Sequence, residues 1–312
     1  MTQKTNRLTS CLLITNPKGT SYRWSRHYES QLKETYGDHN FELYRLTSKD
    51  FDSPKKLRAR LAQLDKQCLL AVLGGDGTAN YVLNQLQKCA SSSAVQATIL
   101  PLWGGNACDL ASMANGKRRT DIRPLLHQGE RTEMHPMQYH LKLGKVEESA
   151  YAMCYVSFGA VAFAANALDE SKLVTATTRI APARFISEMI VSLIALQRAQ
   201  RFTTTQTNQE TTMYDLLLVN GPRMAKVYRT PADLTKPGFV EVRVLRKYPV
   251  LFTHLAHLTR SWVKGSTVKD RSFRLESDTW MQFDGEVRQL KAGTTVSVVP
   301  ADQPLYLLAT TA

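Results

Sequence analysis

The stretch LLAVLGGDGT, at residues 69–78, joins an apolar run to a glycine-rich turn. Its three glycines let the backbone turn tightly and let a polyphosphate approach closely, because no Cβ is in the way. In the residues that follow, Val82, Leu83 and Leu86 fall on one face of a predicted helix. The free N–H groups at the start of such a helix favour an anion. The stretch therefore predicts a buried strand that leads into a phosphate-binding loop.

Asp76 is unusual in such a loop. A carboxylate repels a phosphate unless it holds a metal ion or accepts a hydrogen bond. A Gly-Gly-Asp-Gly run also occurs as a plain surface turn. Here its position between a buried strand and an amphipathic helix favours a nucleotide site.

Strands and helices alternate along the first 128 residues. We expect strands at 11–15, 41–47, 69–73 and 97–102, and helices at 24–36, 54–64 and after Thr78. This order predicts an α/β fold in which a Rossmann-like parallel sheet has helices on both faces. A second glycine-rich turn follows the fourth strand, so two loops from neighbouring strands can close on one nucleotide.

The pattern changes after about residue 128, where short alternating runs replace helical periodicity. These runs predict an antiparallel β-sandwich. The expected strands are 139–143, 151–158, 213–219, 239–245, 279–283 and 295–299, with helices at 183–200 and 250–263. We therefore predict a nucleotide-binding domain at 1–128 and a sandwich domain at 129–312, with the option that the C-terminal strand returns to the first domain.

The composition is ordinary for a globular chain of 312 residues, but the formal net charge of +13 is not. Such a charge suggests an anionic partner, or else a basic surface kept for solubility. The five cysteines show no C-x-x-C spacing and several lie in apolar runs, which favours a reducing, cytoplasmic location. His254 and His257 are three residues apart on a predicted helix, and without a third ligand nearby they are interpreted as structural or solvated.

We expect neither a signal peptide nor a spanning helix. The N-terminal residues are polar, and the apolar region 185–196 is interrupted by polar residues and is shorter than the ~20 residues that a bilayer requires. This region is flanked by arginines, Arg179, Arg184, Arg198 and Arg201. We expect its apolar face to be buried in the core, with contact to an anionic membrane surface as the alternative.

Four motifs, in this order, resemble the diacylglycerol kinase-like lipid kinases and their sphingosine kinase relatives. They are Asn16-Pro17, the 74–78 loop GGDGT, the Pro-x-x-Gly-x-Asn loop at 101–106, and Asp284-Gly285-Glu286. NAD kinases share the glycine loop, but the Asn-Pro and Asp-Gly-Glu motifs resemble the lipid kinase branch. The resemblance covers nearly the whole chain.

The resemblance implies ATP and Mg²⁺ as cofactors and a lipid substrate. It implies that ATP is bound by Asn16, Thr47, Gly74, Gly75, Asp76, Gly77, Thr78, Asn80, Gly104, Gly105 and Asn106. It also implies that Asp284 is the base, with Glu286 beside it and Asp76 as the rival for that role. A bare Asp-Gly pair would otherwise be interpreted as a hairpin turn.

The chain departs from the family pattern in three places. Lys18-Gly19 replaces the usual Ser-Gly after the Asn-Pro motif. The second loop has Gly105 where the family has threonine, and Ala107-Cys108 is inserted before its aspartate. Lys236-Pro237 stands where bacterial members have acidic residues that help to hold a structural Mg²⁺, so we assign no metal to that segment. Cys108 is interpreted as a small packed residue rather than a redox-sensitive one.

The resemblance therefore predicts an ATP-dependent kinase acting on a hydroxyl of a membrane lipid such as diacylglycerol. The alternatives are an NAD kinase-like enzyme and a catalytically silent, basic lipid-binding protein of the same fold. Nucleic acid is not an expected partner, because no motif that reads it is present. The expected location is the cytoplasm with peripheral association at an anionic membrane surface, and a homodimer is left open.

Overall fold

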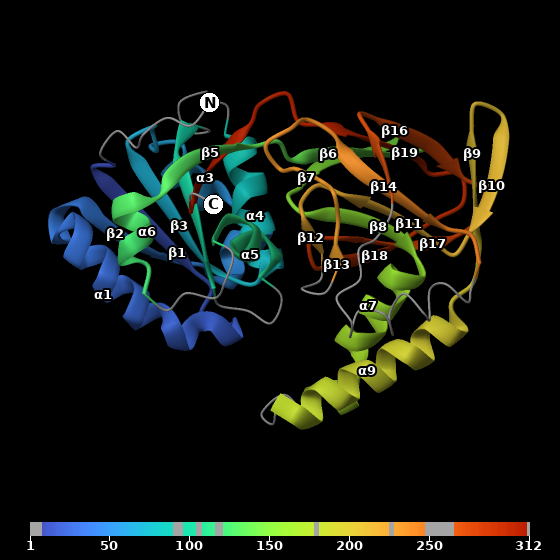
Figure 1. Cartoon of the computed structure of the whole chain (residues 1–312), viewed down its shortest axis with the longest axis horizontal. Coiled ribbons are helices and arrows are strands. Elements are labelled where there is room, and N and C mark those ends of the chain that lie inside the picture. The colour runs from blue at the N-terminus through green and yellow to red at the C-terminus, as the bar shows by residue number, and fades with distance from the viewer. Residues whose placement is uncertain are drawn as a thin grey trace. The chain divides into compact units, whose positions relative to one another are not determined.

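The computed structural model describes residues 8–89, 96–103, 108–115, 121–177, 181–224, 228–246 and 265–310. The chain divides into two compact units. The first contains residues 1–136, 234–237 and 301–312, and the second contains residues 137–233 and 238–300. Both are drawn in Figure 1 and are described separately below. None of the described helices is long and apolar enough to span a membrane.

The first unit is built on a six-stranded sheet with the order β2-β1-β3-β4-β20-β5. All neighbouring strands are parallel except β20 and β5, which pair antiparallel. The strands are β1 (Ser10–Thr15), β2 (Phe41–Arg45), β3 (Cys68–Gly74), β4 (Thr98–Trp103), β5 (Glu130–Met134) and β20 (Leu305–Ala309). The predicted α/β fold with a mostly parallel sheet is confirmed.

Helices cover both faces of this sheet, as its apolar strands require. Every residue of β3 is buried, which is typical of a strand with no solvated face. Alternate residues of β1 and β3 pack with Tyr28 and Leu32 of α1 and Leu125 of α6. The helices of this unit are α1 (Ser25–Tyr36), α2 (Ser48–Asp52), α3 (Lys55–Leu61), α4 (Asp76–Gln87), α5 (Asp109–Asn115) and α6 (Arg123–Gln128), with 3-10 turns at Thr20–Trp24 and Asp38–Asn40.

Two features of the first unit differ from the sequence prediction. The segment predicted as one helix at 54–64 is preceded by a separate short helix, α2, and Ser53 and Pro54 divide α2 from α3 because proline cannot continue a helix. Strand β5, which a boundary at residue 128 would assign to the second domain, pairs with β20 in the first sheet. The chain thus returns from the second unit to add β20 beside β4.

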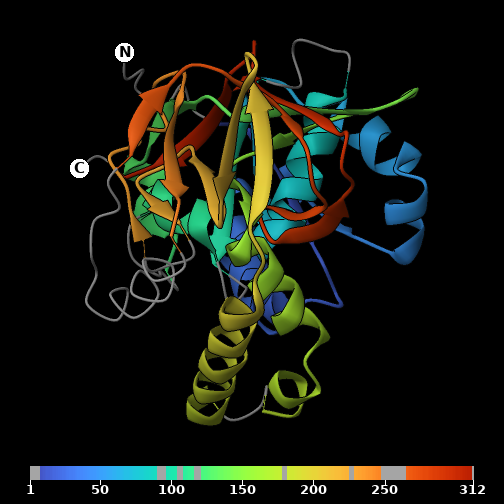
Figure 2. The ribbon, with the colours of Figure 1, turned by 90° about the vertical axis from the view of Figure 1, so that its right-hand side faces the viewer.

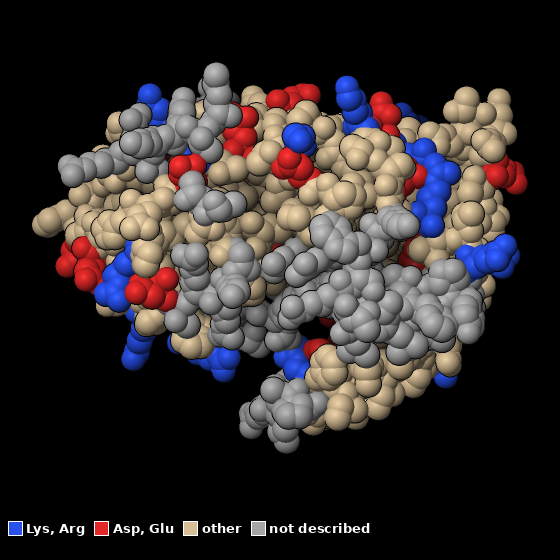
Figure 3. All heavy atoms as spheres, viewed as in Figure 1, with Lys and Arg blue, Asp and Glu red and all other residues tan. Residues whose placement is uncertain are grey.

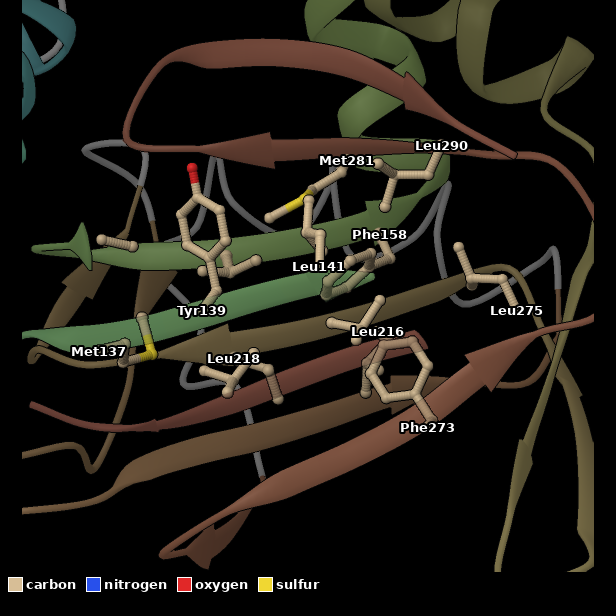
Figure 4. Packing of buried hydrophobic residues seen from close by; sticks show 14 of the residues in the cluster. Met137, Tyr139, Leu141, Phe158, Leu216, Leu218, Phe273, Leu275, Met281 and Leu290 are labelled. Carbon is tan, nitrogen blue, oxygen red and sulfur yellow. The ribbon is translucent and has the colours of Figure 1, made fainter. Parts of the chain in front are cut away.

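The second unit contains two six-stranded antiparallel sheets, in the orders β10-β9-β16-β19-β6-β7 and β15-β14-β11-β8-β17-β18. Apolar side chains from both sheets form one core, shown in Figure 4, to which β6 contributes Tyr139, β8 Phe158 and β16 Phe273. The predicted sandwich of antiparallel sheets is confirmed. The strands are β6 (Met137–Leu143), β7 (Val146–Ala152), β8 (Tyr155–Gly159), β9 (Phe202–Gln206), β10 (Gln209–Met213), β11 (Asp215–Val219), β14 (Phe239–Val244), β15 (Ser266–Val268), β16 (Arg271–Leu275), β17 (Thr279–Phe283), β18 (Glu286–Leu290) and β19 (Thr295–Pro300), with a small ribbon of β12 (Arg223–Met224) and β13 (Tyr228–Arg229).

The prediction of one strand over 151–158 was wrong. The chain bends at Met153 and Cys154, so that β7 ends at Ala152 and pairs with β6 in one sheet, whereas β8 begins at Tyr155 in the other. A strand that changes sheets must bend, and a continuous alternating run in the sequence does not reveal where.

Three helices follow β8: α7 (Ala160–Glu170), α8 (Lys172–Thr177) and α9 (Ala181–Arg198). Figure 2 shows α9 extending away from the sheets of this unit, with α7 beside it. The expectation that the apolar face of 185–196 is buried was wrong, because Phe185, Ile186, Met189, Ile190 and Ile194 are exposed. The helix predicted at 250–263, with His254 and His257, lies outside the described residues.

Candidate active site

The glycine loop lies between the end of β3 and the start of α4. Gly75 precedes the helix in an extended conformation, with a φ of −81°, and no side chain caps the helix. The first bond of the helix joins the N–H of Ala79 to the carbonyl oxygen of Gly75 at 3.0 Å. The N–H groups before Ala79 therefore have no acceptor within the helix, which makes this end of α4 suited to an anion.

Gly74 is required by the close approach of Thr78. A Cβ on Gly74 would lie 2.4 Å from the Thr78 Cβ, so any larger residue displaces the first turn of α4. The Thr78 hydroxyl oxygen in turn accepts a hydrogen bond from the Asn16 side-chain amide at 3.2 Å. Asn16 directly follows β1, and Thr78 lies in the first turn of the helix that follows β3, so this contact joins the segments that leave two neighbouring strands at the carboxyl edge of the sheet.

Asp76 lies at the first position of α4 and is largely buried. Its Oδ1 accepts the N–H of Leu110 at 3.3 Å, and Leu110 belongs to the first turn of α5. The buried Cys108 packs beside this contact, with its Sγ 3.9 Å from the carbonyl oxygen of Gly74. The start of α5, which follows β4 in the chain, is thus adjacent to the glycine loop, as the parallel order of the strands predicts.

Thr47 directly precedes α2 and forms a capping box with Asp50 of that helix. Its N–H and its hydroxyl both donate to Asp50 Oδ2 at 2.7 Å, and the Tyr44 hydroxyl donates to Oδ1 at 2.6 Å. Burial acts to raise the pKa of Asp50, but these hydrogen bonds outweigh it and lower the pKa below its ordinary value. The prediction named Thr47 and missed Asp50, although Thr-x-x-Asp is a recognisable capping pattern.

Lys18 is a cation that the structure places at the start of α2. Its ammonium group donates to the Ser48 hydroxyl at 2.8 Å, and its backbone N–H donates to the Asn16 side-chain oxygen at 3.1 Å. Its side chain is exposed and can reorient towards a phosphate. Arg23 is also exposed, but its guanidinium lies over the Trp24 ring at 5.7 Å.

Asn80 is one turn further along α4 and is buried. Its side-chain oxygen accepts a hydrogen bond from the Asn84 amide at 2.9 Å. This hydrogen bond fixes the orientation of both side-chain amides, which are buried residues of α4. Gly104, Gly105 and Asn106 lie outside the described residues.

Asp284 and Glu286 lie in the second unit, at the hairpin between β17 and β18. The Asp284 side chain is 1% exposed and its φ is +44°. It accepts the N–H groups of Met153, Cys154 and Tyr155, the last two at 2.8 and 3.0 Å. Asp284 therefore fixes the bend between β7 and β8, a structural role that the sequence did not predict. Glu286, by contrast, is exposed.

No group of three or more His, Cys, Asp or Glu side chains is placed to hold a metal ion in the part of the chain that the structure describes. In kinases Mg²⁺ is usually held by one or two carboxylates together with substrate phosphates, so a full protein cage is not needed. Asp76 is the carboxylate that the glycine loop offers for this purpose.

A mostly parallel sheet with a glycine loop at its carboxyl edge is the arrangement that α/β domains use to bind nucleotides. Residues 10–139 match the diacylglycerol kinase catalytic domain. The resemblance stated from the motifs is thereby confirmed.

Solved structures share the fold over 98% of the chain. A diacylglycerol kinase from Bacillus anthracis str. Sterne is 13% identical and superposes with a TM-score of 0.66, covering 98% of this chain and 98% of its own. Yeast NADH kinase in complex with NADH is 12% identical, with a TM-score of 0.58, covering 98% of this chain and 85% of its own. None of the curated proteins matches the sequence. These low identities support the shared fold alone.

Proposed function

We propose that the protein is an ATP-dependent lipid kinase that transfers a γ-phosphate to a hydroxyl of a membrane lipid such as diacylglycerol. The observation that carries the proposal is the uncapped start of α4 at the glycine loop, within a region that matches the diacylglycerol kinase catalytic domain. Kinase chemistry depends mainly on positioning and on stabilisation of charge, and this loop is suited to both.

Each residue around the loop has a definite part in this proposal. The N–H groups at the start of α4 bind phosphate oxygens, and Gly75 keeps the approach free of side-chain atoms. Asn16 holds the Thr78 hydroxyl in place, and the exposed Lys18 supplies a positive charge beside the loop. Asp76 would help to hold Mg²⁺, which would neutralise part of the negative charge of the phosphates.

Two carboxylates compete for the role of orienting the acceptor hydroxyl and receiving its proton. The family resemblance favours Asp284, and the position at the glycine loop favours Asp76. The hydrogen bonds that Asp284 accepts from three backbone N–H groups give it a structural task in addition to any chemical one. Substitution of each carboxylate, with stability measured alongside turnover, separates the two assignments.

The experiment that tests the function is incubation of the purified protein with labelled ATP, Mg²⁺ and a total lipid extract. A labelled lipid product supports the proposal. An NAD kinase-like activity is the second candidate, favoured by the fold shared with yeast NADH kinase. Parallel reactions with NAD and NADH test it. Phosphorylation of the dinucleotide without any labelled lipid would contradict the lipid kinase proposal.

A further inference from the structure

Helix α9 exposes a row of large apolar side chains. Ile186, Ile190 and Ile194 are spaced four residues apart and therefore lie one above another on the helix, with Phe185 and Met189 beside them. Their exposed fractions lie between 36% and 54%. Half of the large exposed hydrophobic side chains found among the described residues, five of ten, lie on this helix. The lower right of Figure 3, where α9 lies in the view of Figure 1, is accordingly mostly uncharged.

The inner face of α9 already has its packing partners. Ala195 and Leu196 of α9, together with Ala199 just after it, pack with Ala160 and Ala164 of α7 in a separate small core. On the same helix the buried Ser187 shares a hydrogen bond of 2.7 Å with Thr177 of α8. These contacts hold α9 in place without the exposed row, which therefore forms a second apolar face of the helix.

The same row ends at a positively charged pocket. Arg198 continues the four-residue spacing of Ile186, Ile190 and Ile194, and it lines a cavity of about 230 Å³ with Arg201. Phe163 and Trp280 also line this cavity, and their ring centroids are 6.2 Å apart. Tryptophan is the residue that membrane proteins place at the boundary between lipid and water.

A carboxylate of α9 and a carboxylate that lines the pocket are each paired with another cation. Glu188 of α9 pairs with Arg184 at 2.6 Å, and Asp278 of the pocket pairs with Lys291 at 2.8 Å. Neither Arg198 nor Arg201 has a carboxylate partner among the described residues, and Arg201 instead lies over the Tyr214 ring at 5.1 Å. Both guanidinium groups are exposed at the end of the apolar row.

We propose that the exposed face of α9, from Phe185 to Arg198, together with the Arg198–Arg201 pocket docks onto an anionic bilayer. The apolar row enters the boundary between headgroups and acyl chains, and the pocket takes a lipid phosphate. An anionic bilayer fits this face better than a second copy of the chain, because the exposed Arg198 and Arg201 at the end of the apolar row match negatively charged headgroups. The net charge of +13 attracts the chain to the same surface. This proposal extends the proposed function, because it identifies the surface by which a lipid kinase would contact the membrane that contains its substrate.

Sedimentation with vesicles tests the docking surface without any catalytic step. The vesicles are of phosphatidylcholine alone or of phosphatidylcholine with phosphatidylglycerol. We expect the parent protein to prefer the anionic vesicles at low salt. The double variant Ile186→Ser, Ile190→Ser should lower the partition to them at least about tenfold, because the contribution of buried apolar area is lost. The exposed Val146, at 72%, supplies the matched control Val146→Ser, which should bind as the parent does.

The arginine variants separate charge from insertion. Arg198→Gln and Arg201→Gln should each lower binding to anionic vesicles about fivefold at low salt and have little effect on neutral ones. High salt should abolish the difference, because it screens the charge. The matched control is Arg274→Gln, whose side chain is well exposed on β16. Thermal unfolding verifies that every variant is folded.

Three results would overturn the proposal: equal binding of the parent to both vesicles, unchanged binding of the isoleucine variant, or a dimer in solution that this variant dissociates while vesicle binding stays intact.

The kinase proposal is contradicted by a different result. A parent protein that binds anionic vesicles but phosphorylates no lipid refutes the activity and leaves the docking surface standing. Activity on a dispersed short-chain diacylglycerol that survives Ile186→Ser, Ile190→Ser supports both proposals.

Discussion

The Asp284 carboxylate accepts the backbone N–H of Cys154 at 2.8 Å, across 130 positions of the chain. Two further N–H groups, of Met153 and Tyr155, donate to the same side chain. The bend that moves the chain from one sheet of the sandwich to the other therefore depends on a residue that the family resemblance assigns to catalysis. Asp284 thus has a structural role and a proposed catalytic role, so both stability and turnover must be measured when it is substituted.

Asp284→Asn should destabilise the protein. An asparagine retains one carbonyl oxygen, and its amide group cannot accept the remaining N–H donors, so we expect a loss of about 1–3 kcal/mol in unfolding free energy. Urea unfolding measures it, with the exposed Glu286→Gln as the control expected to leave stability unchanged. If Asp284 is also the base, turnover of the folded fraction should fall at least about 100-fold. Turnover near the parent value would restrict Asp284 to its structural role.

Asp76→Asn should act on the nucleotide as well as on turnover. Asp76 lies at the start of α4 and accepts the Leu110 N–H, so loss of its charge changes the region where phosphates and Mg²⁺ are expected. We predict weaker binding of Mg²⁺·ATP, measured by calorimetry, together with a lower kcat. Unchanged nucleotide affinity with a reduced kcat would instead assign Asp76 to the acceptor hydroxyl.

Gly75→Val should abolish nucleotide binding and leave the fold intact. The backbone of Gly75 has a φ of −81°, which any residue adopts, so the valine side chain acts by blocking the approach of the phosphates. Gly74→Ala is the informative comparison, because its Cβ would collide with Thr78 and disturb the start of α4 itself. Calorimetry with ATP and thermal unfolding distinguish the two effects. Parent-like affinity in Gly75→Val would show that the loop is not the phosphate site.

Asp215 should make stability fall as pH rises. Its carboxyl is buried at the start of α7, where burial raises its pKa well above the ordinary value although the N–H groups of Val161 and Ala160 act in the opposite direction. The folded state thus keeps a proton that the unfolded chain loses above about pH 4. Since the folded state binds more protons, the unfolding free energy decreases with increasing pH from that value upward.

Asp215→Asn should remove this dependence. Asparagine retains an acceptor for the Val161 N–H, which lies 2.7 Å from Asp215 Oδ1, and it cannot ionise. The melting temperature of the variant, compared with the parent between about pH 4 and pH 8, should therefore decline less. An identical pH profile for both proteins would contradict the assignment.

The sequence by itself determined the features that depend on local chemistry. The apolar run at 69–73 predicted a buried strand, and the glycines that follow predicted a tight phosphate loop, because both need only the properties of consecutive residues. The alternation of strand and helix likewise determined the parallel sheet, and the short alternating runs determined the antiparallel sheets. Asp50, which the prediction missed, could also have been recognised from the sequence, because it lies only three positions after Thr47 in a capping pattern.

Only the tertiary structure decided which groups meet across long separations. Asn16 reaches Thr78 over 62 positions, because two parallel strands bring their carboxyl ends to one edge. Asp284 is held by donors more than a hundred positions away, and the apolar face of α9 is exposed because α7 and α8 cover its other side. Periodicity identifies an apolar face, but burial is a property of the neighbours that pack on it, and those neighbours are determined by the fold.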